Sequence, residues 1–265
     1  MKRLVCFSIL LLPLLGVGIA LSGRGSNTSA DQNASTPAHI LKNYQVVWED
    51  EFDGTTLNTS KWQYRNEGKP AGKYATVSRN NVELDGKGCL LIKITKDSDG
   101  KYYTGSVQTR NIFGTTYGYF ECRVVMNKQL GPEVVFRLHS ADFGKTLDPV
   151  KDGTQISIFQ YHRKTPYKIR HAVYWNIGAD RQTDNKLIQL KDIGEGFHTF
   201  GLEWTQNEYI FYVDGKETWR TSKAVSQHNE YLVLLADLAG YGGNPAQGSF
   251  PDTVTFDYVK VYKPK

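Results

Sequence analysis

The feature that most constrains this chain is a two-residue alternation of large apolar side chains that recurs from Tyr44 to the C-terminus. A period of two is that of a β-strand, whose successive side chains point to opposite faces. Asp-Gly pairs at 99–100 and 214–215 follow such runs and are typical of tight hairpin turns. No long window keeps the 3.6-residue period of a helix. The pattern predicts an all-β chain, most simply one large antiparallel β sandwich. The clearest alternating runs are 90–95, 200–204, 209–213 and 254–262.

Composition agrees with a folded domain and excludes several classes of protein. With 40% hydrophobic, 22% charged and 12% aromatic residues, the 265-residue chain is neither a disordered tail nor a membrane-embedded bundle. Its formal net charge is +5, and without Lys2 and Arg3 it is 5 − 2 = +3. That charge is too weak to predict nucleic acid as a partner, and the sequence has no basic patch with interleaved aromatic residues.

The N-terminal residues 1–22 have the pattern of a secretory signal peptide. Two basic residues precede a long apolar run, and small residues follow at Gly18, Ala20 and Ser22, as signal peptidase requires. The apolar run approaches the ~20 residues that span a bilayer, so an uncleaved anchor is the alternative. We expect a secreted or cell-envelope protein that is not embedded in the membrane once the signal is removed.

The segment 23–42 is expected to be a flexible linker. It is small and polar and almost free of large apolar side chains. The folded domain is then expected at 43–265, since no internal repeat and no second kind of composition interrupts it.

Two cysteines remain after the signal segment, Cys89 and Cys122. In an oxidising compartment they could pair, but both lie in strand-like runs where a free buried thiol is equally sensible. They do not predict a zinc site, because no pair of histidines lies near them. The disulfide therefore stays an open alternative.

Four sequence blocks occur in order along the chain: VVWEDEFDG, YGYFECRV, FHTFGLEWTQNEYIFYVDG and FDYVKVYK. In order and at their spacing, they resemble the family 16 glycoside hydrolases, which include laminarinases, lichenases, agarases and carrageenases. The resemblance covers nearly all of residues 45–263 and implies a β-jelly-roll of two curved antiparallel sheets, of the concanavalin A-like lectin and glucanase type. It also implies a sugar cleft across the concave face and cleavage of internal β-linkages with retention of configuration.

The family's catalytic strand reads E-x-D-x-x-E, and this chain departs from it at each acidic position. The resemblance implies DGTEIDIFEYH, whereas the chain reads DGTQISIFQYH. Gln155 stands for the nucleophile, Ser157 for the assisting aspartate and Gln160 for the acid/base. Positions 155 and 160 point to opposite faces of a regular strand, so a β-bulge is expected between them.

The amide side chains predict binding without cleavage. An amide matches a carboxyl group in shape, but it neither transfers a proton at working pH nor serves as a carboxylate nucleophile. We therefore expect a catalytically inactive protein that binds a β-linked polysaccharide, a β-glucan or a galactan, in its cleft. One alternative is an active glycosidase or transglycosylase with relocated catalytic groups. The acids near the signature strand that could take over are Glu133, Asp142, Asp148 and Asp152. The second alternative is a structural or adhesive β sandwich.

Further cleft residues follow from the resemblance. Asn81 matches an asparagine that reaches a sugar, and Arg137 stands where an indole usually borders the cleft. His171 and Trp175 lie on the strand after the catalytic one, although Trp175 is equally suited to the core, since large aromatic residues serve both.

The resemblance also implies a structural calcium ion on the convex face, with Glu51 and Asp257 as its side-chain ligands. Hard carboxylate oxygens suit Ca²⁺, which takes ~6–8 oxygen ligands. The alternative is an ordinary surface pair of acids. The sequence requires no other cofactor.

Overall fold

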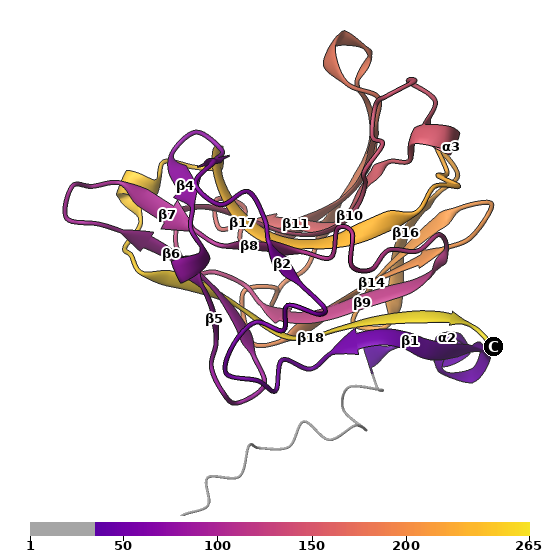
Figure 1. Cartoon of the computed structure of the whole chain (residues 1–265), viewed down its shortest axis with the longest axis horizontal. Helices are drawn as coiled ribbons and strands as arrows, with labels where there is room; N and C mark the ends of the chain where they lie inside the picture. The colour runs from indigo at the N-terminus through magenta and orange to yellow at the C-terminus, as the bar shows by residue number, and fades with distance from the viewer. Residues whose placement is uncertain (1–34) are drawn as a thin grey trace, which may run out of the picture.

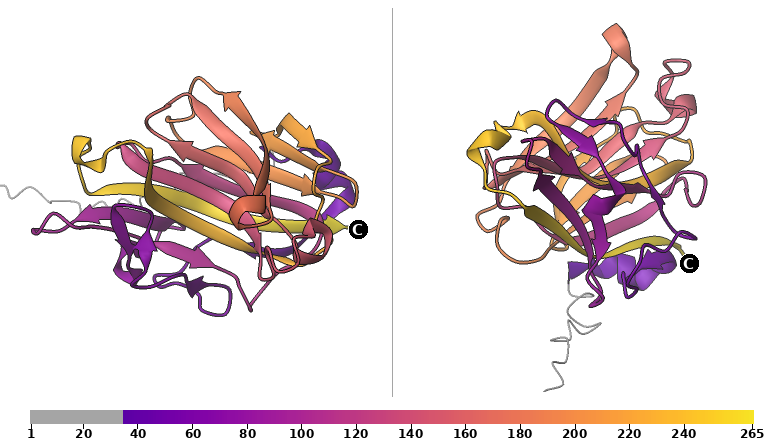
Figure 2. Two further views of the ribbon diagram at one scale, coloured as in Figure 1. Left: turned by 90° about the horizontal axis from the view of Figure 1, so that it is seen from above. Right: turned by 60° about the vertical axis from the view of Figure 1, so that its left-hand side comes forward.

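The computed structural model describes residues 35–265, and these form two stacked β-sheets (Figure 1). We call the 11-stranded sheet the outer sheet and the seven-stranded sheet the inner sheet. Figures 1 and 2 show the inner sheet curving away from the outer one at the β12–β13 hairpin, so its concave side faces outward. The all-β jelly-roll of two curved sheets is therefore confirmed.

The outer sheet runs in the spatial order β16 (Lys216–Thr221), β15 (Tyr209–Val213), β14 (His198–Trp204), β9 (Gly118–Val125), β18 (Asp252–Pro264), β6 (Leu90–Lys96), β7 (Tyr102–Thr104), β4 (Ala75–Val77) and β3 (Pro70–Ala71). Beside β18 lies β1 (Tyr44–Asp50), and beside β6 lies β5 (Val82–Leu84). The strand pairs are antiparallel apart from β4 and β7, which run parallel.

The inner sheet runs in the order β13 (Gln182–Gln189), β12 (Lys168–Trp175), β11 (Gln155–His162), β10 (Gly131–Ser140), β17 (Glu230–Gly242), β8 (Ser106–Gln108) and β2 (Gln63–Tyr64). Helical segments in the described chain are short. They are α2 (Ala38–Asn43), α3 (Pro149–Asp152) and the 3₁₀ turns η1 (Arg79–Asn81), η2 (Gly178–Asp180) and η3 (Pro245–Gln247).

The core lies between the facing surfaces of the two sheets. On β6, Leu90, Ile92 and Ile94 are fully buried, whereas the alternating Leu91 and Lys93 are only partly covered. Burying such side chains is the main favourable term in folding, at ~1.5–3 kcal/mol each. The period of two seen in the sequence is thus the period of burial.

The Asp214–Gly215 turn closes the β15–β16 hairpin as expected. Asp214 has φ +48° and Gly215 has φ +73°, so both residues adopt the left-handed region. A type I′ turn needs two such residues, and its twist matches that of the strands it joins. This is the reason why Asp-Gly predicts the hairpin.

The folded domain begins earlier than the expected boundary at residue 43. Helix α2 (Ala38–Asn43) begins inside the expected linker 23–42, and its Ile40 is fully buried against Tyr119, Tyr212 and Tyr262. The expectation failed because one apolar residue in a polar segment gives no periodic signal. The rest of that linker up to residue 34 and the expected signal peptide, 1–22, lie outside the described residues.

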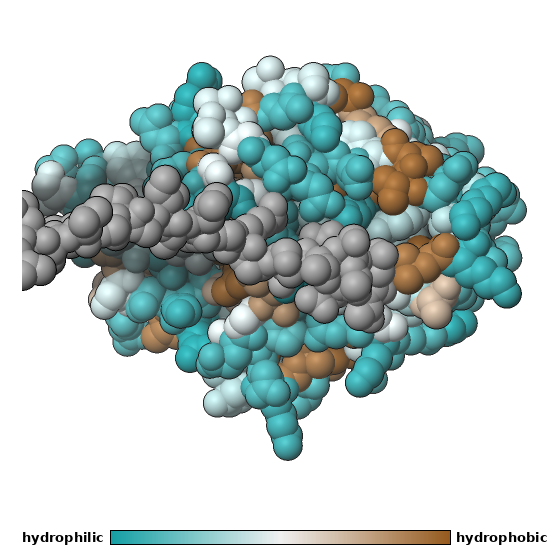
Figure 3. Space-filling view, turned by 90° about the horizontal axis from the view of Figure 1, so that it is seen from below, coloured by the Kyte–Doolittle hydropathy of each residue, from teal (hydrophilic) through white to brown (hydrophobic). Residues whose placement is uncertain are grey.

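The face seen from below in Figure 1 is mostly hydrophilic, with small separate apolar areas (Figure 3). Among residues 35–265 no helix has the length and apolar character needed to cross a bilayer. Cys89 and Cys122 are not joined by a disulfide bond. Burial raises the pKa of the Cys122 thiol well above its usual value.

Candidate functional site

A cavity of about 420 Å³ lies on the concave face of the inner sheet, over β10, β11, β12 and β17. Its wall is polar and charged, with aromatic and aliphatic side chains between the charges. The residues that line it are Glu133, Arg137, Gln155, Gln160, His162, Thr165, Lys168, Ile169, Arg170, Tyr174, Arg181, Leu187, Asp237, Ala239 and Tyr241.

A β-bulge on β11 brings Gln155 and Gln160 into this same cavity. Ser157 pairs with Ala172 of β12, but the next pair joins Gln160 to Arg170, so β11 holds one extra residue. The register with β10 shifts at the same place. An extra residue reverses the facing of every side chain beyond it. The bulge therefore re-aims Gln160 to the side that Gln155 already faces.

The two glutamines differ from Ser157 in their access to the cavity. Gln160 Oε1 accepts a hydrogen bond from the Tyr174 hydroxyl at 3.1 Å, which fixes the amide beside an aromatic ring. Ser157 is fully buried, and its Oγ has no hydrogen-bond partner among the described residues. Of the three signature positions, 155 and 160 can therefore touch a ligand, whereas Ser157 lies beneath the surface.

His171 lies in the core and not in the cleft, contrary to expectation. It is fully buried, its Nδ1 lies 2.5 Å from the carbonyl oxygen of Ile158 and its Nε2 lies 2.9 Å from Thr218 Oγ1. Burial lowers the pKa of His171 to about 4, so the ring is neutral. A neutral ring that donates from Nδ1 must accept from the Thr218 hydroxyl at Nε2. His171 thus holds the carbonyl of a residue within the bulge.

Trp175 and Asn81 are likewise absent from the cavity wall. Trp175 follows Tyr174 on β12, faces the opposite side and packs against the core. Asn81 is 4% exposed, and its Nδ2 donates to the carbonyls of Lys93 and Tyr103 and to Thr95 Oγ1. These contacts satisfy the amide within the outer sheet, so it reaches no ligand in the cavity.

Arg137 lies in the cavity wall and also borders a neighbouring cavity near Arg65. Its Nε is buried and has no hydrogen-bond partner among the described residues. Burial and the nearby Arg65 lower the pKa of Arg137 to about 10, so it remains charged at neutral pH. A guanidinium donor left unpaired in a cavity is suited to bind a ligand acceptor.

Two carboxyl groups face the cavity from neighbouring strands. Glu133 of β10 lies directly opposite Asp237 of β17 in the antiparallel register. Burial and the Asp237 charge raise the pKa of Glu133 to about 7. Burial also raises the pKa of Asp237, against the opposing effects of Arg137 and Arg65.

The other acids near the signature strand are engaged elsewhere. Asp152 Oδ1 and Oδ2 accept hydrogen bonds from Thr146, and Asp148 caps the short helix α3. Asp142 Oδ2 lies 2.9 Å from His228 Nε2. Of the four acids considered from sequence, Glu133 is the one in the cavity.

The sequence reasoning did not name several cavity residues. The strand-like alternation of 168–174 could have shown that Lys168, Arg170 and Tyr174 share one face of β12. No sequence signal brings Arg181 or Asp237 to this place, since they come from a loop and from a strand far along the chain.

The two expected calcium ligands each lie beside a cation of the chain. Asp257 accepts a hydrogen bond from Arg123 Nη1 at 2.7 Å, and Glu51 Oε1 lies 2.7 Å from Lys260 Nζ. Among the described residues, no group of three or more His, Cys, Asp or Glu could hold a metal ion. A calcium ion held by these two acids would therefore need backbone carbonyls or water for most of its ~6–8 oxygen ligands, and it stays a prediction.

Two curved sheets stacked in this order, with a cavity on the concave side of the inner one, define a β-jelly-roll of the glucanase type. The sequence model of glycosyl hydrolases family 16 matches residues 70–237, which is more than half of the chain. The chain therefore belongs to family 16 of the glycosyl hydrolases.

Known proteins resemble it over most of its length. Glucan endo-1,3-beta-glucosidase A1 of Niallia circulans is 24% identical over 277 residues, which cover 88% of this chain and 40% of that protein. The beta-glucanase of Rhodothermus marinus is 26% identical over 279 residues, with coverage of 94% and 93%. The laminarinase catalytic domain of Thermotoga maritima MSB8 shares the fold, with a TM-score of 0.73, 24% identity and coverage of 84% and 99%. The chain spans less than half the length of three curated relatives that it matches.

Proposed function

We propose that this protein is a secreted carbohydrate-binding member of family 16 that holds a β-linked polysaccharide in the concave cavity without cutting it. The observation that carries the proposal is the pair of amides, Gln155 and Gln160, that line the cavity on either side of the β11 bulge. In this proposal they replace the family's nucleophile and acid/base, and Ser157 replaces the assisting aspartate.

The chemistry of the two amides supports binding over hydrolysis. Retaining hydrolysis needs two carboxyl groups ~5–5.5 Å apart, one as nucleophile and one as acid/base. A glutamine supplies neither function, but its amide donates and accepts hydrogen bonds with sugar hydroxyls. The aromatic rings of Tyr174 and Tyr241, the latter 68% exposed, offer flat apolar surfaces for sugar rings.

The runner-up is an active glycosidase in which Glu133 and Asp237 supply the carboxyl groups. Their opposed positions in one cavity and the Glu133 pKa of about 7 favour it, since that value suits a general acid. It ranks second because the raised pKa of Asp237 works against its role as an ionised nucleophile.

The test is affinity electrophoresis of the folded protein in laminarin, lichenan, agarose and carrageenan, together with a reducing-end assay on the same polymers. We expect retardation by at least one polymer and no products above a boiled control. Tyr174→Ala should weaken the retardation, whereas Tyr167→Ala, which removes an exposed tyrosine outside the cavity wall, should not. Products that disappear in Glu133→Gln and Asp237→Asn would instead establish the runner-up. If the folded protein shows neither retardation nor products, the structural or adhesive β sandwich remains as the explanation.

A further inference from the structure

We propose that the cavity selects an anionic polysaccharide, one that carries sulfate esters or carboxylates, and binds its anionic groups through Arg137, Lys168, Arg170 and Arg181. This inference rests on the proposed function, because it names the class of glycan that the same cavity holds. It follows from how the charges of the cavity wall are placed and paired.

The four cations of the cavity form no ion pair with a carboxylate among the described residues, whereas several other arginines do. Arg79, Arg123 and Arg220 each form an ion pair with a carboxylate of the chain. No nitrogen of the four cavity cations lies within 4.0 Å of a carboxylate oxygen of the described residues. The four cations outnumber the two carboxyl groups of the same wall, Glu133 and Asp237, and they repel one another, so their grouping favours an external anion.

Three of the four cations lie apart from the two carboxyl groups. Glu133 and Asp237 belong to β10 and β17, whereas Lys168 and Arg170 lie on β12 and Arg181 lies on the chain just before β13. The fourth cation, Arg137, shares β10 with Glu133. Arg181 stacks on Tyr174, with its guanidinium carbon 4.9 Å from the ring centroid. Stacking on the ring leaves the edges of the guanidinium free to donate hydrogen bonds. The β12 side of the cavity therefore combines an aromatic side chain with cations.

Nearby cations act on two histidines close to the cavity. Burial is the main cause that lowers the pKa of His139, to about 3, and Arg137, Arg65 and Arg110 add to it. Burial also lowers the pKa of His162, and the charges of Lys164 and Arg170 act in the same direction.

Guanidinium groups match both candidate anions. They donate paired hydrogen bonds to the oxygens of a sulfate ester or of a carboxylate. A neutral glucan offers hydroxyl groups alone, which add no counter-charge to the four cations. The anionic glycan gains from every cation that it reaches, and this gain weakens as salt rises.

The experiment compares four polymers in affinity electrophoresis and calorimetry at constant pH. They are a sulfated galactan (κ-carrageenan), the same galactan after chemical removal of sulfate, a mannuronate-rich alginate and neutral laminarin. We expect a sulfated or carboxylated polymer to bind at least about tenfold more tightly than the neutral ones, and to lose affinity between 50 and 300 mM NaCl. Carrageenan binding alone assigns sulfate, and alginate binding alone assigns carboxylate.

Matched variants separate this cavity from general electrostatic attraction. Arg170→Gln and Arg181→Gln, both exposed positions, should lower the affinity for the anionic polymer about tenfold and leave the thermal unfolding temperature unchanged. Arg170→Lys should retain most of the binding. The control Arg79→Gln removes an exposed arginine outside the cavity and should have no effect.

The outcomes distinguish this inference from the proposal on which it rests. Equal binding of laminarin, or of the desulfated galactan, would overturn the anionic preference and leave polysaccharide binding in place. An equal loss of affinity in Arg79→Gln would also overturn it, since the attraction would then be general. Failure of the folded protein to bind any of the four polymers would overturn both.

Discussion

At the scale of single residues, the chain keeps several polar groups where the environment changes their chemistry. Gln155 and Gln160 meet in the cavity, Glu133 faces Asp237, and Glu230 lies fully buried beside Thr154. At each of these positions, exchanging an amide for a carboxyl group, or the reverse, changes the charge while nearly keeping the shape of the side chain. Two predictions follow from this property.

The first concerns the cavity amides. Gln155→Glu with Gln160→Glu places carboxyl groups on both sides of the bulge without adding volume, and we expect weak endo-hydrolysis of the polymer that the protein binds. The variant keeps Ser157, because this residue is fully buried and a carboxylate there would lower the stability of the fold. Reducing ends measure the gain, and Gln206→Glu, an exposed position, is the control. A double variant that folds and binds but makes no products would show that the cleft has lost more than its acids.

The second concerns Glu230. Burial raises its pKa from 4.5 to about 8, although Thr154 donates to its Oε1 through N and Oγ1. Between these pH values the folded chain holds a proton that the unfolded chain has released, so rising pH lowers stability. Glu230→Gln removes this loss. We expect the unfolding free energy of the variant, relative to that of the unaltered protein, to rise by roughly 2–4 kcal/mol from pH 5 to pH 8.5. Urea unfolding measures it.

The control for Glu230 is Glu195→Gln, which alters an exposed glutamate. Its unfolding free energy should follow that of the unaltered protein across the same pH range. If Glu230→Gln also stays parallel to the unaltered protein, the buried carboxyl group is not the source of the pH dependence.

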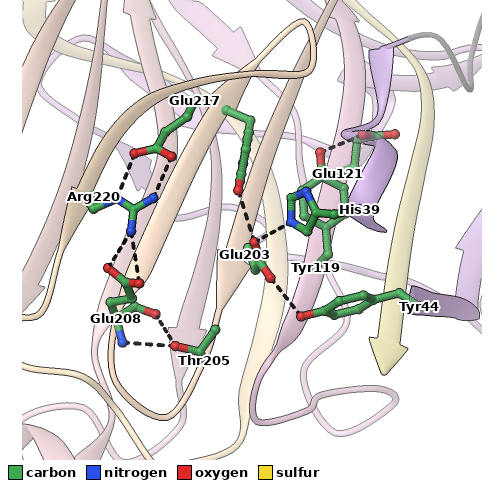
Figure 4. A network of polar contacts seen from close by, with 10 residues as sticks. His39, Tyr44, Tyr119, Glu121, Glu203, Thr205, Glu208, Glu217 and Arg220 are labelled. Carbon is green, nitrogen blue, oxygen red and sulfur yellow. Dashed lines mark hydrogen bonds and ion pairs between the residues drawn. The ribbon is translucent and has the colours of Figure 1, made fainter. Parts of the chain in front are cut away.

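At the scale of elements, the segment around α2 is attached to the outer sheet by side-chain hydrogen bonds (Figure 4). Glu203 of β14 accepts hydrogen bonds from Tyr44 Oη at 2.8 Å and Tyr212 Oη at 3.0 Å, and His39 Nε2 lies 2.9 Å from it. Thr36 Oγ1 donates to the buried Glu121 at 3.0 Å. A short helix is marginal by itself, so these tertiary contacts must hold it.

The third prediction tests how much the packing of α2 contributes to the stability of the domain. Ile40 is fully buried between tyrosines of the outer sheet, and Ile40→Ala should cost about 2–4 kcal/mol of unfolding free energy. Leu41→Ala removes the neighbouring side chain, which is 38% exposed, and should cost less than about 0.5 kcal/mol. Chemical denaturation gives both values. Equal, small losses in the two variants would mean that α2 contributes little to the stability of the domain.

At the scale of the whole molecule, the net charge of +5 says little about function, because its placement matters more. Ion pairs neutralise several surface cations, whereas the four cations of the cavity have no ion-pair partner within residues 35–265. The fold thereby concentrates a modest charge on the concave face, where low-dielectric walls strengthen its field.

The fourth prediction concerns the pH dependence of that field. Glu133, which faces Asp237, Arg170 and Arg137, has a pKa of about 7, so it is mostly ionised at pH 8 and mostly protonated at pH 6. Lowering the pH removes its negative charge, and we expect an anionic polysaccharide to bind a few-fold more tightly at pH 6 than at pH 8. Glu133→Gln should reduce this dependence. Calorimetry at the two pH values gives the comparison, and an unchanged dependence in the variant would assign it to another group.

The sequence by itself determined the strands and the strand that carries the candidate site. Period-two alternation and Asp-Gly turns specify β-hairpins through local sterics alone, and the resemblance of the four blocks to family 16 implied the jelly-roll. The resemblance places 155 and 160 in one cleft, which on their spacing predicts a bulge, and the structure contains one.

Only the tertiary structure decided which side chains meet in the cavity. A polar residue such as His171 can satisfy its hydrogen bonds in the core as well as in a cleft, and its facing depends on the register set by a bulge on the neighbouring strand. Asp237 joins Glu133 because β17 pairs with β10 across more than 100 residues of chain. Local residue patterns do not encode such long-range pairings, since these depend on how both sheets bury their apolar faces together.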